Sequence, residues 1–205
     1  MDEDRNWRIE PKIGLGDLKF GMSKSEVDRF ASIYGPSKGV SADRIPDDIL
    51  HSTLAELGEG LTEEEKQEIL SAYQESGPSA AAETEVRGDK DRLVLTYASD
   101  RLVEILADTT ARRLKFGDML VFEAPPIEVV RHIAATLRET PVILNEEVVF
   151  PANFVFLFEF LRVAGGAYPA GDAYVEGNPS DRSILWRASP RVRGVDLSLY
   201  RPMTL

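Results

Sequence analysis

The chain contains no cysteine and only two histidines among its 205 residues. The missing cysteine excludes disulfides, thiolate zinc sites, iron–sulfur clusters and cysteine nucleophiles. Positive charge is also scarce, since 24 lysine and arginine residues oppose 35 aspartate and glutamate residues and leave a net charge of −11. Nucleic-acid binders carry the opposite charge. We therefore expect no cofactor, no metal and no nucleic-acid partner. The acidity suits a basic partner, or serves solubility alone.

Long apolar runs are missing as well. The longest apolar stretch, Val148 to Leu161, is interrupted by Pro151, Asn153 and Glu159. It is shorter than the roughly 20 residues that a bilayer span requires. The first residues have neither the basic nor the apolar segment of a signal peptide. We therefore expect a cytoplasmic protein without a membrane partner, and the length fits one domain, residues 1–205.

Catalytic motifs are not found either. His51 and His132 each lack a second histidine at metal-binding spacing. The glycines of residues 14–16 do not have the spacing of a nucleotide-binding loop. The adjacent acids at 47–48 and 146–147 are sequence neighbours and cannot close on a substrate from opposite sides. We expect no catalytic residues and no metal ligands, and an uncharacterised hydrolase remains a further alternative.

Local signals predict an α+β fold. Ser23 and Glu26 form a capping box, and apolar residues at helical spacing continue to a stop at Gly35-Pro36, which predicts one helix from Ser23 to Gly35. Pro126 begins a second helix that extends to Arg138. Period-two patterns predict strands around these helices, including a hairpin turning at Ser99-Asp100. The expected strands lie at 18–20, 92–97, 102–107, 114–116, 119–122, 183–188 and 195–200.

Residues 154–164 fit two structures. The alternating phenylalanines at 154, 156, 158 and 160 are typical of a strand. Asn153 as an N-cap and Gly165-Gly166 as a stop favour a helix. We favour the helix here. The complete pattern predicts a mostly antiparallel sheet flanked by helices on one side.

Residues 41–76 form an acidic segment. They contain ten acidic and two basic residues, so that a net charge of −8 lies here. Apolar spacing predicts two amphipathic helices: Ile49, Leu50, Leu54 and Leu57 mark the first, and Ile69, Leu70 and Tyr73 mark the second. Residues 76–83 read as a flexible linker. We expect this helical insert to bind a basic partner through Asp43, Asp47, Asp48, Glu56, Glu59, Glu63, Glu64 and Glu68.

Two segments share a weak similarity. Residues 20–29 align without gaps with residues 122–131, matching at phenylalanine, glutamate, valine and arginine positions. Both predict a strand, a turn and a helix. The similarity fits either a duplicated unit or a chance agreement between two amphipathic helix starts.

The stretch from Ile13 to Val27 contains the pattern G-x-G-x-L-x-F-G-M-S-x-x-E-V. Over residues 7–36 the chain resembles bacterial immunity proteins that accompany polymorphic or contact-dependent toxins. A shorter core of this pattern also occurs in small outer-membrane assembly lipoproteins, but the lipid-bearing cysteine of that family is missing here. The resemblance implies packing roles for Phe20, Met22, Val27 and Phe30, and it implies no active-site residues.

The resemblance, the acidity and the lack of catalytic motifs favour a protein without enzymatic activity. We expect an immunity protein that neutralises a cognate toxin by covering its active site or the surface through which substrate enters, and a basic nuclease is the toxin that suits the charge best. The alternative is a non-catalytic adaptor or chaperone-like module of a secretion system, which would show the same sequence features.

Overall fold

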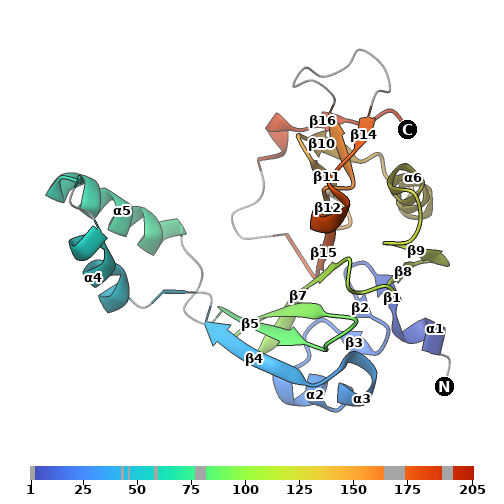
Figure 1. The fold of residues 1–205 in the computed structure, drawn as a ribbon, viewed down its shortest axis with the longest axis horizontal. Coiled ribbons are helices and arrows are strands. Elements are labelled where there is room, and N and C mark those ends of the chain that lie inside the picture. The colour runs from blue at the N-terminus through green and yellow to red at the C-terminus, as the bar shows by residue number, and fades with distance from the viewer. Residues whose placement is uncertain are drawn as a thin grey trace.

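The computed structural model describes residues 3–42, 44–45, 47–57, 60–76, 82–163, 174–190 and 196–205. It shows an α+β fold dominated by antiparallel sheet, as the sequence predicts (Figure 1). The large sheet has nine strands in the order β16-β10-β11-β12-β15-β7-β6-β5-β4. These strands are β4 (Ser37–Ala42), β5 (Ala82–Arg87), β6 (Leu93–Ala98), β7 (Arg101–Asp108), β10 (Val142–Leu144), β11 (Glu147–Phe150), β12 (Val155–Phe158), β15 (Ser183–Arg187) and β16 (Arg201–Pro202).

A smaller sheet has the order β3-β2-β1-β8-β9. Its strands are β1 (Arg8–Glu10), β2 (Gly14–Leu15), β3 (Leu18–Lys19), β8 (Lys115–Phe116) and β9 (Met119–Leu120). A third sheet pairs β13 (Leu161–Val163) with β14 (Tyr174–Glu176). The helices are α1 (Glu3–Asn6), α2 (Lys24–Asp28), α3 (Ala31–Tyr34), α4 (Asp47–Leu57), α5 (Glu63–Ser76) and α6 (Pro126–Leu137). Two 3-10 turns are η2 (Pro179–Asp181) and η3 (Leu197–Leu199).

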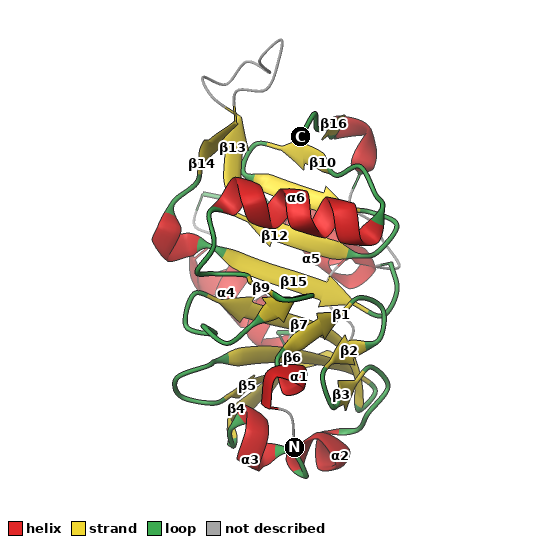
Figure 2. Ribbon diagram, turned by 90° about the vertical axis from the view of Figure 1, so that its right-hand side faces the viewer, coloured by secondary structure: helices red, strands yellow, loops and turns green. Residues whose placement is uncertain are grey.

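The hydrophobic core lies on one face of the large sheet. α6 packs across this face and buries Val129, Val130 and Ile133 against the strands (Figure 2). The small sheet is tied to the same face, because the indole Nε1 of Trp186 donates a hydrogen bond to the carbonyl of Gly14 at 2.9 Å. Apolar burial on this face supplies the main stabilisation of the fold.

The predicted capping box at the start of α2 is confirmed. The backbone N–H of Ser23 donates to Glu26 Oε2 at 2.8 Å, and the backbone N–H of Glu26 donates to Ser23 Oγ at 3.3 Å. The single helix expected from Ser23 to Gly35 is wrong, because the chain leaves helical geometry at Phe30 (φ −101°, ψ 16°). α2 and α3 therefore form separately, and each places one residue, Val27 or Tyr34, in the core.

Tyr34 joins α3 to the N-terminal strands. Its hydroxyl oxygen lies 2.9 Å from the carbonyl oxygens of both Asn6 and Leu15, and it accepts a hydrogen bond from the Asp17 N–H at 3.0 Å. Burial raises the pKa of Tyr34 to about 12. The hydroxyl thus stays protonated and fixes the position of α3 against the small sheet.

The helix favoured for 154–164 is also wrong, because this segment contains strands β12 and β13. β12 pairs with β11 on one edge and with β15 on the other, so its backbone groups are satisfied within the sheet. Left-handed residues at Phe154 (φ 54°) and Glu159 (φ 58°) bound the strand and are incompatible with a continuous helix.

Two smaller expectations need correction. The strand expected at 195–200 is the 3-10 turn η3, in which Asp196 Oδ1 accepts a hydrogen bond from the Ser198 N–H at 3.0 Å. Of the residues expected to form a linker at 76–83, Ser76 belongs to α5 and residues 82–83 belong to β5. Residue 195 and residues 77–81 lie outside the described residues. The turn expected at Ser99-Asp100 is confirmed, with φ angles of 50° and 57°.

The large and small sheets together are built from two halves with the same chain order. The first half runs hairpin β2–β3, helices α2 and α3, then β4, β5, β6 and β7. The second runs hairpin β8–β9, helix α6, then β10, β11, β12 and β15. The last strands of the two halves, β7 and β15, pair antiparallel at the middle of the sheet. This arrangement favours duplication as the origin of the similarity between residues 20–29 and 122–131.

Each half carries an insertion. α4 and α5 lie between β4 and β5, whereas β13 and β14 lie between β12 and β15. The insertion in the first half contains the acidic segment identified in the sequence. It is therefore the feature that most distinguishes the first half from the second.

Candidate protein-binding surface

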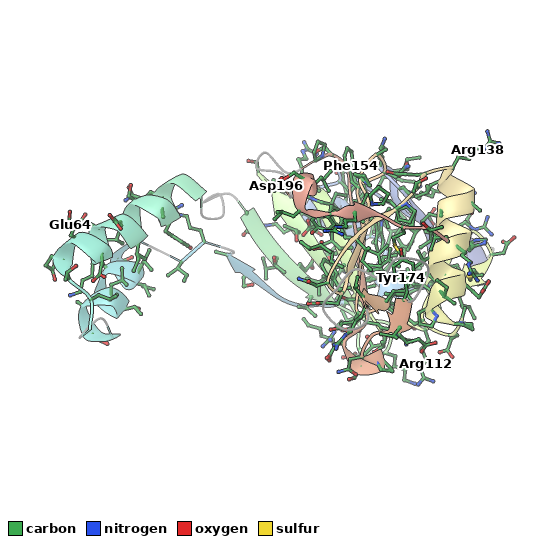
Figure 3. All side chains as sticks on the ribbon, turned by 90° about the horizontal axis from the view of Figure 1, so that it is seen from above. Glu64, Arg112, Arg138, Phe154, Tyr174 and Asp196 are labelled. Carbon is green, nitrogen blue, oxygen red and sulfur yellow. The ribbon has the colours of Figure 1, made fainter. Side chains whose placement is uncertain are left out.

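Helices α4 and α5 form an acidic arm, which we define as residues 47–57 and 60–76. The arm stands apart from the sheets in two perpendicular views (Figures 1 and 3). It lies on the side of the large sheet opposite to α6. No described residue of the arm belongs to the hydrophobic core of the sheets. The arm therefore contributes little to the packing of the rest of the protein.

Local interactions explain why the arm is helical. A capping box begins α5, where the Thr62 N–H donates to Glu65 Oε2 at 2.7 Å and the Glu65 N–H donates to Thr62 Oγ1 at 3.2 Å. The hydrogen bond from the Thr62 backbone lowers the pKa of Glu65. At the base of the arm, the Ile45 N–H donates to the hydroxyl of Tyr73 at 2.7 Å, and the Arg44 guanidinium lies 5.1 Å from the Tyr73 ring.

The arm presents the predicted partner-binding residues that the structure describes. Exposed side chains are found at Asp48, Glu56, Glu63, Glu64 and Glu68. Glu63 pairs with Lys66 at 2.8 Å, within one turn of α5. Asp43, Glu59 and the side chain of Asp47 lie outside the described part of the chain. Binding of a partner by the predicted residues remains a prediction. Because the arm stands apart from the sheets, a partner can reach its exposed acids without steric hindrance from the rest of the protein.

The arm also exposes some of the apolar side chains that mark its two helices in the sequence. Ile49 is 51 % exposed and Ile69 is 40 % exposed. Leu70, by contrast, is 6 % exposed. The contact between α4 and α5 therefore leaves part of the apolar surface of each helix open to solvent. The arm therefore offers both charge and apolar contact area to a partner.

The second part of the candidate surface is the outer face, which we define as the face of the large sheet pointing away from α6. An apolar row crosses it because consecutive strands are in register. Val149 pairs with Phe156, Phe156 with Leu185, Leu185 with Leu106, and Leu106 with Val94. Alternation along a strand places such residues on one face. Sequence patterns show this alternation within each strand but not the register between strands.

A hollow of about 160 Å³ lies on the outer face. Its walls include Phe154, Phe156 and Phe158 from the segment around β12, together with Leu185 from β15 and Leu197 from η3. The lining is therefore mainly apolar and aromatic. Such hollows accept an apolar side chain of a partner, and buried anchors of this kind supply much of the affinity at protein interfaces.

Polar groups beside the hollow are paired with one another. The hydroxyl of Tyr200 hydrogen-bonds to Glu147, and burial raises the pKa of Tyr200. Arg187 Nε lies 2.9 Å from Glu104 Oε2 across the adjacent strands β15 and β7. These polar groups therefore connect neighbouring strands beside the hollow and shape its rim.

The two histidines have different surroundings. His132 Nε2 lies 2.9 Å from the carbonyl oxygen of Phe116, where it connects α6 to the small sheet. His51 is exposed on α4. Among the described residues, no three histidine, aspartate or glutamate side chains gather in a way that could hold a metal ion. None of the described helices is both long and apolar enough to cross a membrane.

Comparison with protein-family models, with curated proteins and with solved structures finds no match to this chain. The geometry of the acidic arm and the outer face is therefore the basis for a functional proposal.

Proposed function

We propose that this protein is an immunity protein that binds a cognate toxin with a basic surface and neutralises it without chemistry of its own. The observation that carries the proposal is the acidic arm, with its exposed acids on helices that stand clear of the core. The motif in residues 13–27 supports the immunity assignment, through its resemblance to proteins of that kind.

Electrostatics explains what the arm does in this proposal. A concentrated negative field raises the encounter rate with a positively charged partner and orients it before contact. A nuclease is the partner class that suits this field best, because its own substrate is a polyanion and its binding surface is basic. An acidic protein placed over that surface blocks access of the nucleic acid.

The outer face supplies the short-range contacts in this proposal. The arm lies on the same side of the sheet as this face, opposite to α6 (Figure 3). A partner attracted by the arm can therefore also contact the hollow beside Phe156 and the half-buried members of the apolar row, Val94, Leu106 and Phe156. Charge selects the partner and accelerates association, whereas apolar burial slows dissociation.

Co-expression tests the proposal. A toxin gene encoded beside this chain is expressed in a test strain together with the wild-type protein or with an arm variant carrying D48N, E56Q, E64Q and E68Q. A control variant carries D118N, E123Q, E128Q and E146Q, which remove the same number of exposed acids outside the arm. We expect growth with the wild type and the control and killing with the arm variant. Killing in the presence of the wild type would reject the proposal.

Affinity capture separates the immunity function from that of a secretion adaptor. The tagged protein is incubated with lysate of its source organism at low and moderate salt, and bound proteins are identified by mass spectrometry. One stoichiometric partner that stays bound at moderate salt is expected of an immunity protein. Several weakly held partners would assign the protein to the adaptor class instead.

A further inference from the structure

Strand β4 forms one edge of the large sheet. One of its sides pairs with β5, and no described strand pairs with its other side. All six residues of β4 are exposed, including Val40 at 47 %. A strand of this length with no buried side chain gains little from packing, and it presents unpaired backbone donors and acceptors to solvent.

The same order of elements in the two halves identifies the strand edge of the second half that corresponds to β4. β10 holds the same place there as β4 does in the first half, since both follow the helix after the hairpin. The free side of β10 is covered by β16, which pairs antiparallel with it at Val142–Pro202 and Ile143–Arg201. The chain thus adds a strand to one of two equivalent edges and leaves the other without one among its described residues.

We propose that β4 takes an extended, positively charged segment of the toxin as an additional antiparallel strand. This inference rests on the proposed function and names the mode of binding. In strand addition, backbone hydrogen bonds supply affinity and side chains supply specificity. We expect the toxin segment to pair with β4 as β16 pairs with β10, because β4 and β10 hold the same place in the order of elements of their halves.

Charge identifies the occupant as a basic partner rather than a second copy of this chain. The acidic arm follows β4 directly in the chain, since α4 begins at Asp47 and β4 ends at Ala42. Two copies paired through β4 would bring two such arms, each within a segment of net charge −8, to the same junction. A cationic strand at that edge instead gains from the same field.

A pair of synthetic peptides tests strand addition directly. The probe is a ten-residue peptide that alternates threonine and lysine, and its control is the same peptide with every backbone nitrogen methylated. Both carry the same charge, but the control has no N–H groups with which to pair. We expect the full-length protein to bind the probe about tenfold or more tightly than the control, since several hydrogen bonds are lost.

Amide hydrogen exchange reports the position of binding. We expect the probe to slow exchange of β4 amides about tenfold or more, while amides of the central strands β7 and β15 are unchanged. Equal affinity for probe and control, or unchanged exchange in β4, would overturn strand addition. Protection of β4 in a dimer of the free protein would assign the edge to a second copy and would also overturn it.

The arm variant D48N, E56Q, E64Q, E68Q separates this inference from the proposed function. We expect it to weaken both peptides while the ratio of their affinities stays the same. If both peptides bind equally and both weaken in the arm variant, the arm recognises cations but β4 takes no strand. If the arm variant binds both peptides as the wild type does, the electrostatic basis of the proposed function fails.

Discussion

At the scale of single residues, the fold depends on a buried charge cluster between the large sheet and α2. Arg87 is 0 % exposed and Glu85 is 2 % exposed. Arg87 Nη1 lies 2.9 Å from Glu85 Oε1, and its Nη2 lies 2.8 Å from Asp28 Oδ1. The Tyr97 hydroxyl donates to Glu85 Oε2 at 2.8 Å. Every charge in this cluster thus has a partner, which makes its burial tolerable.

Removing one member of the cluster leaves a buried charge without compensation. We predict that Arg87→Met lowers the free energy of unfolding by about 3–5 kcal/mol, because the Glu85 carboxylate loses its cation. Urea unfolding measures the change. The double variant Arg87→Met with Glu85→Gln is the control and should recover part of the loss. A loss below about 1 kcal/mol in the single variant would show that Arg87 is not needed to compensate Glu85.

At the scale of elements, the hairpins β2–β3 and β8–β9, which hold the same place in the two halves, allow a matched comparison. Gly16 and Gly117 occupy the same turn position, with φ angles of 53° and 59°. A Cβ atom on Gly16 would lie 2.3 Å from the backbone oxygen of Asn6, whereas on Gly117 it would meet the His132 side chain at 2.9 Å. The second clash is relieved when the His132 side chain rotates and gives up its hydrogen bond to Phe116, but the first requires the backbone to move.

We therefore predict that Gly16→Ala destabilises the protein more than Gly117→Ala does. Both variants place alanine in the left-handed region, at about 1–2 kcal/mol each. Gly16→Ala adds about 1–3 kcal/mol of steric strain. Thermal and urea unfolding of the two variants measure the difference. Equal destabilisation would contradict the close approach of Asn6 to the first hairpin.

The capping box of α2 makes a prediction about pH. The hydrogen bond from the Ser23 backbone lowers the pKa of Glu26 below its ordinary 4.5. A carboxylate with a lowered native pKa stabilises the fold above its unfolded pKa and loses this effect as the pH falls through the native value. Glu26→Gln should therefore be less stable than wild type at pH 7, with a difference that disappears in acid.

Urea unfolding at several pH values between 7 and 3 measures the effect of Glu26→Gln. Glu123→Gln is the control, since Glu123 is exposed and makes no helix cap. A difference between wild type and Glu26→Gln that persists unchanged to pH 3 would exclude the carboxylate as its source.

These elements also show how far the sequence predicts the structure. The capping box at Ser23, the turn at Ser99-Asp100 and helix α6 follow from residues close in the chain, and their prediction is confirmed. The segment 154–164 was predicted wrongly because its conformation depends on pairing with β11 and β15, which lie elsewhere in the sequence. Local patterns contain no information about such neighbours.

The candidate surface likewise has one part that the sequence predicts and another part that it does not. The acids of the arm are visible as composition, so their position on two helices could be predicted. The apolar row and the hollow near Phe156 depend on the register of distant strands. The side of β4 that no described strand pairs with depends on the order of the whole sheet. These features could therefore be identified only from the structure and not from the sequence.

At the scale of the whole molecule, the insertion of α4 and α5 adds a strongly acidic arm to one of the two halves of the protein. Ala42 and Glu83 are cross-strand neighbours in β4 and β5, so the chain leaves and returns at one point of the sheet edge. Such an insertion changes the surface without changing the core. The arm, the outer face and the β4 edge can then act together on one partner.

The rate of association with the cognate toxin, measured by stopped flow over a range of salt concentrations, tests the central claim most directly. We predict that the arm variant D48N, E56Q, E64Q, E68Q associates about tenfold more slowly than wild type at low salt, with a flatter salt dependence. The control variant D118N, E123Q, E128Q, E146Q should stay close to wild type. Equal rates and salt slopes for the arm variant and the control would contradict the account, because the position of the acids would then be irrelevant to binding.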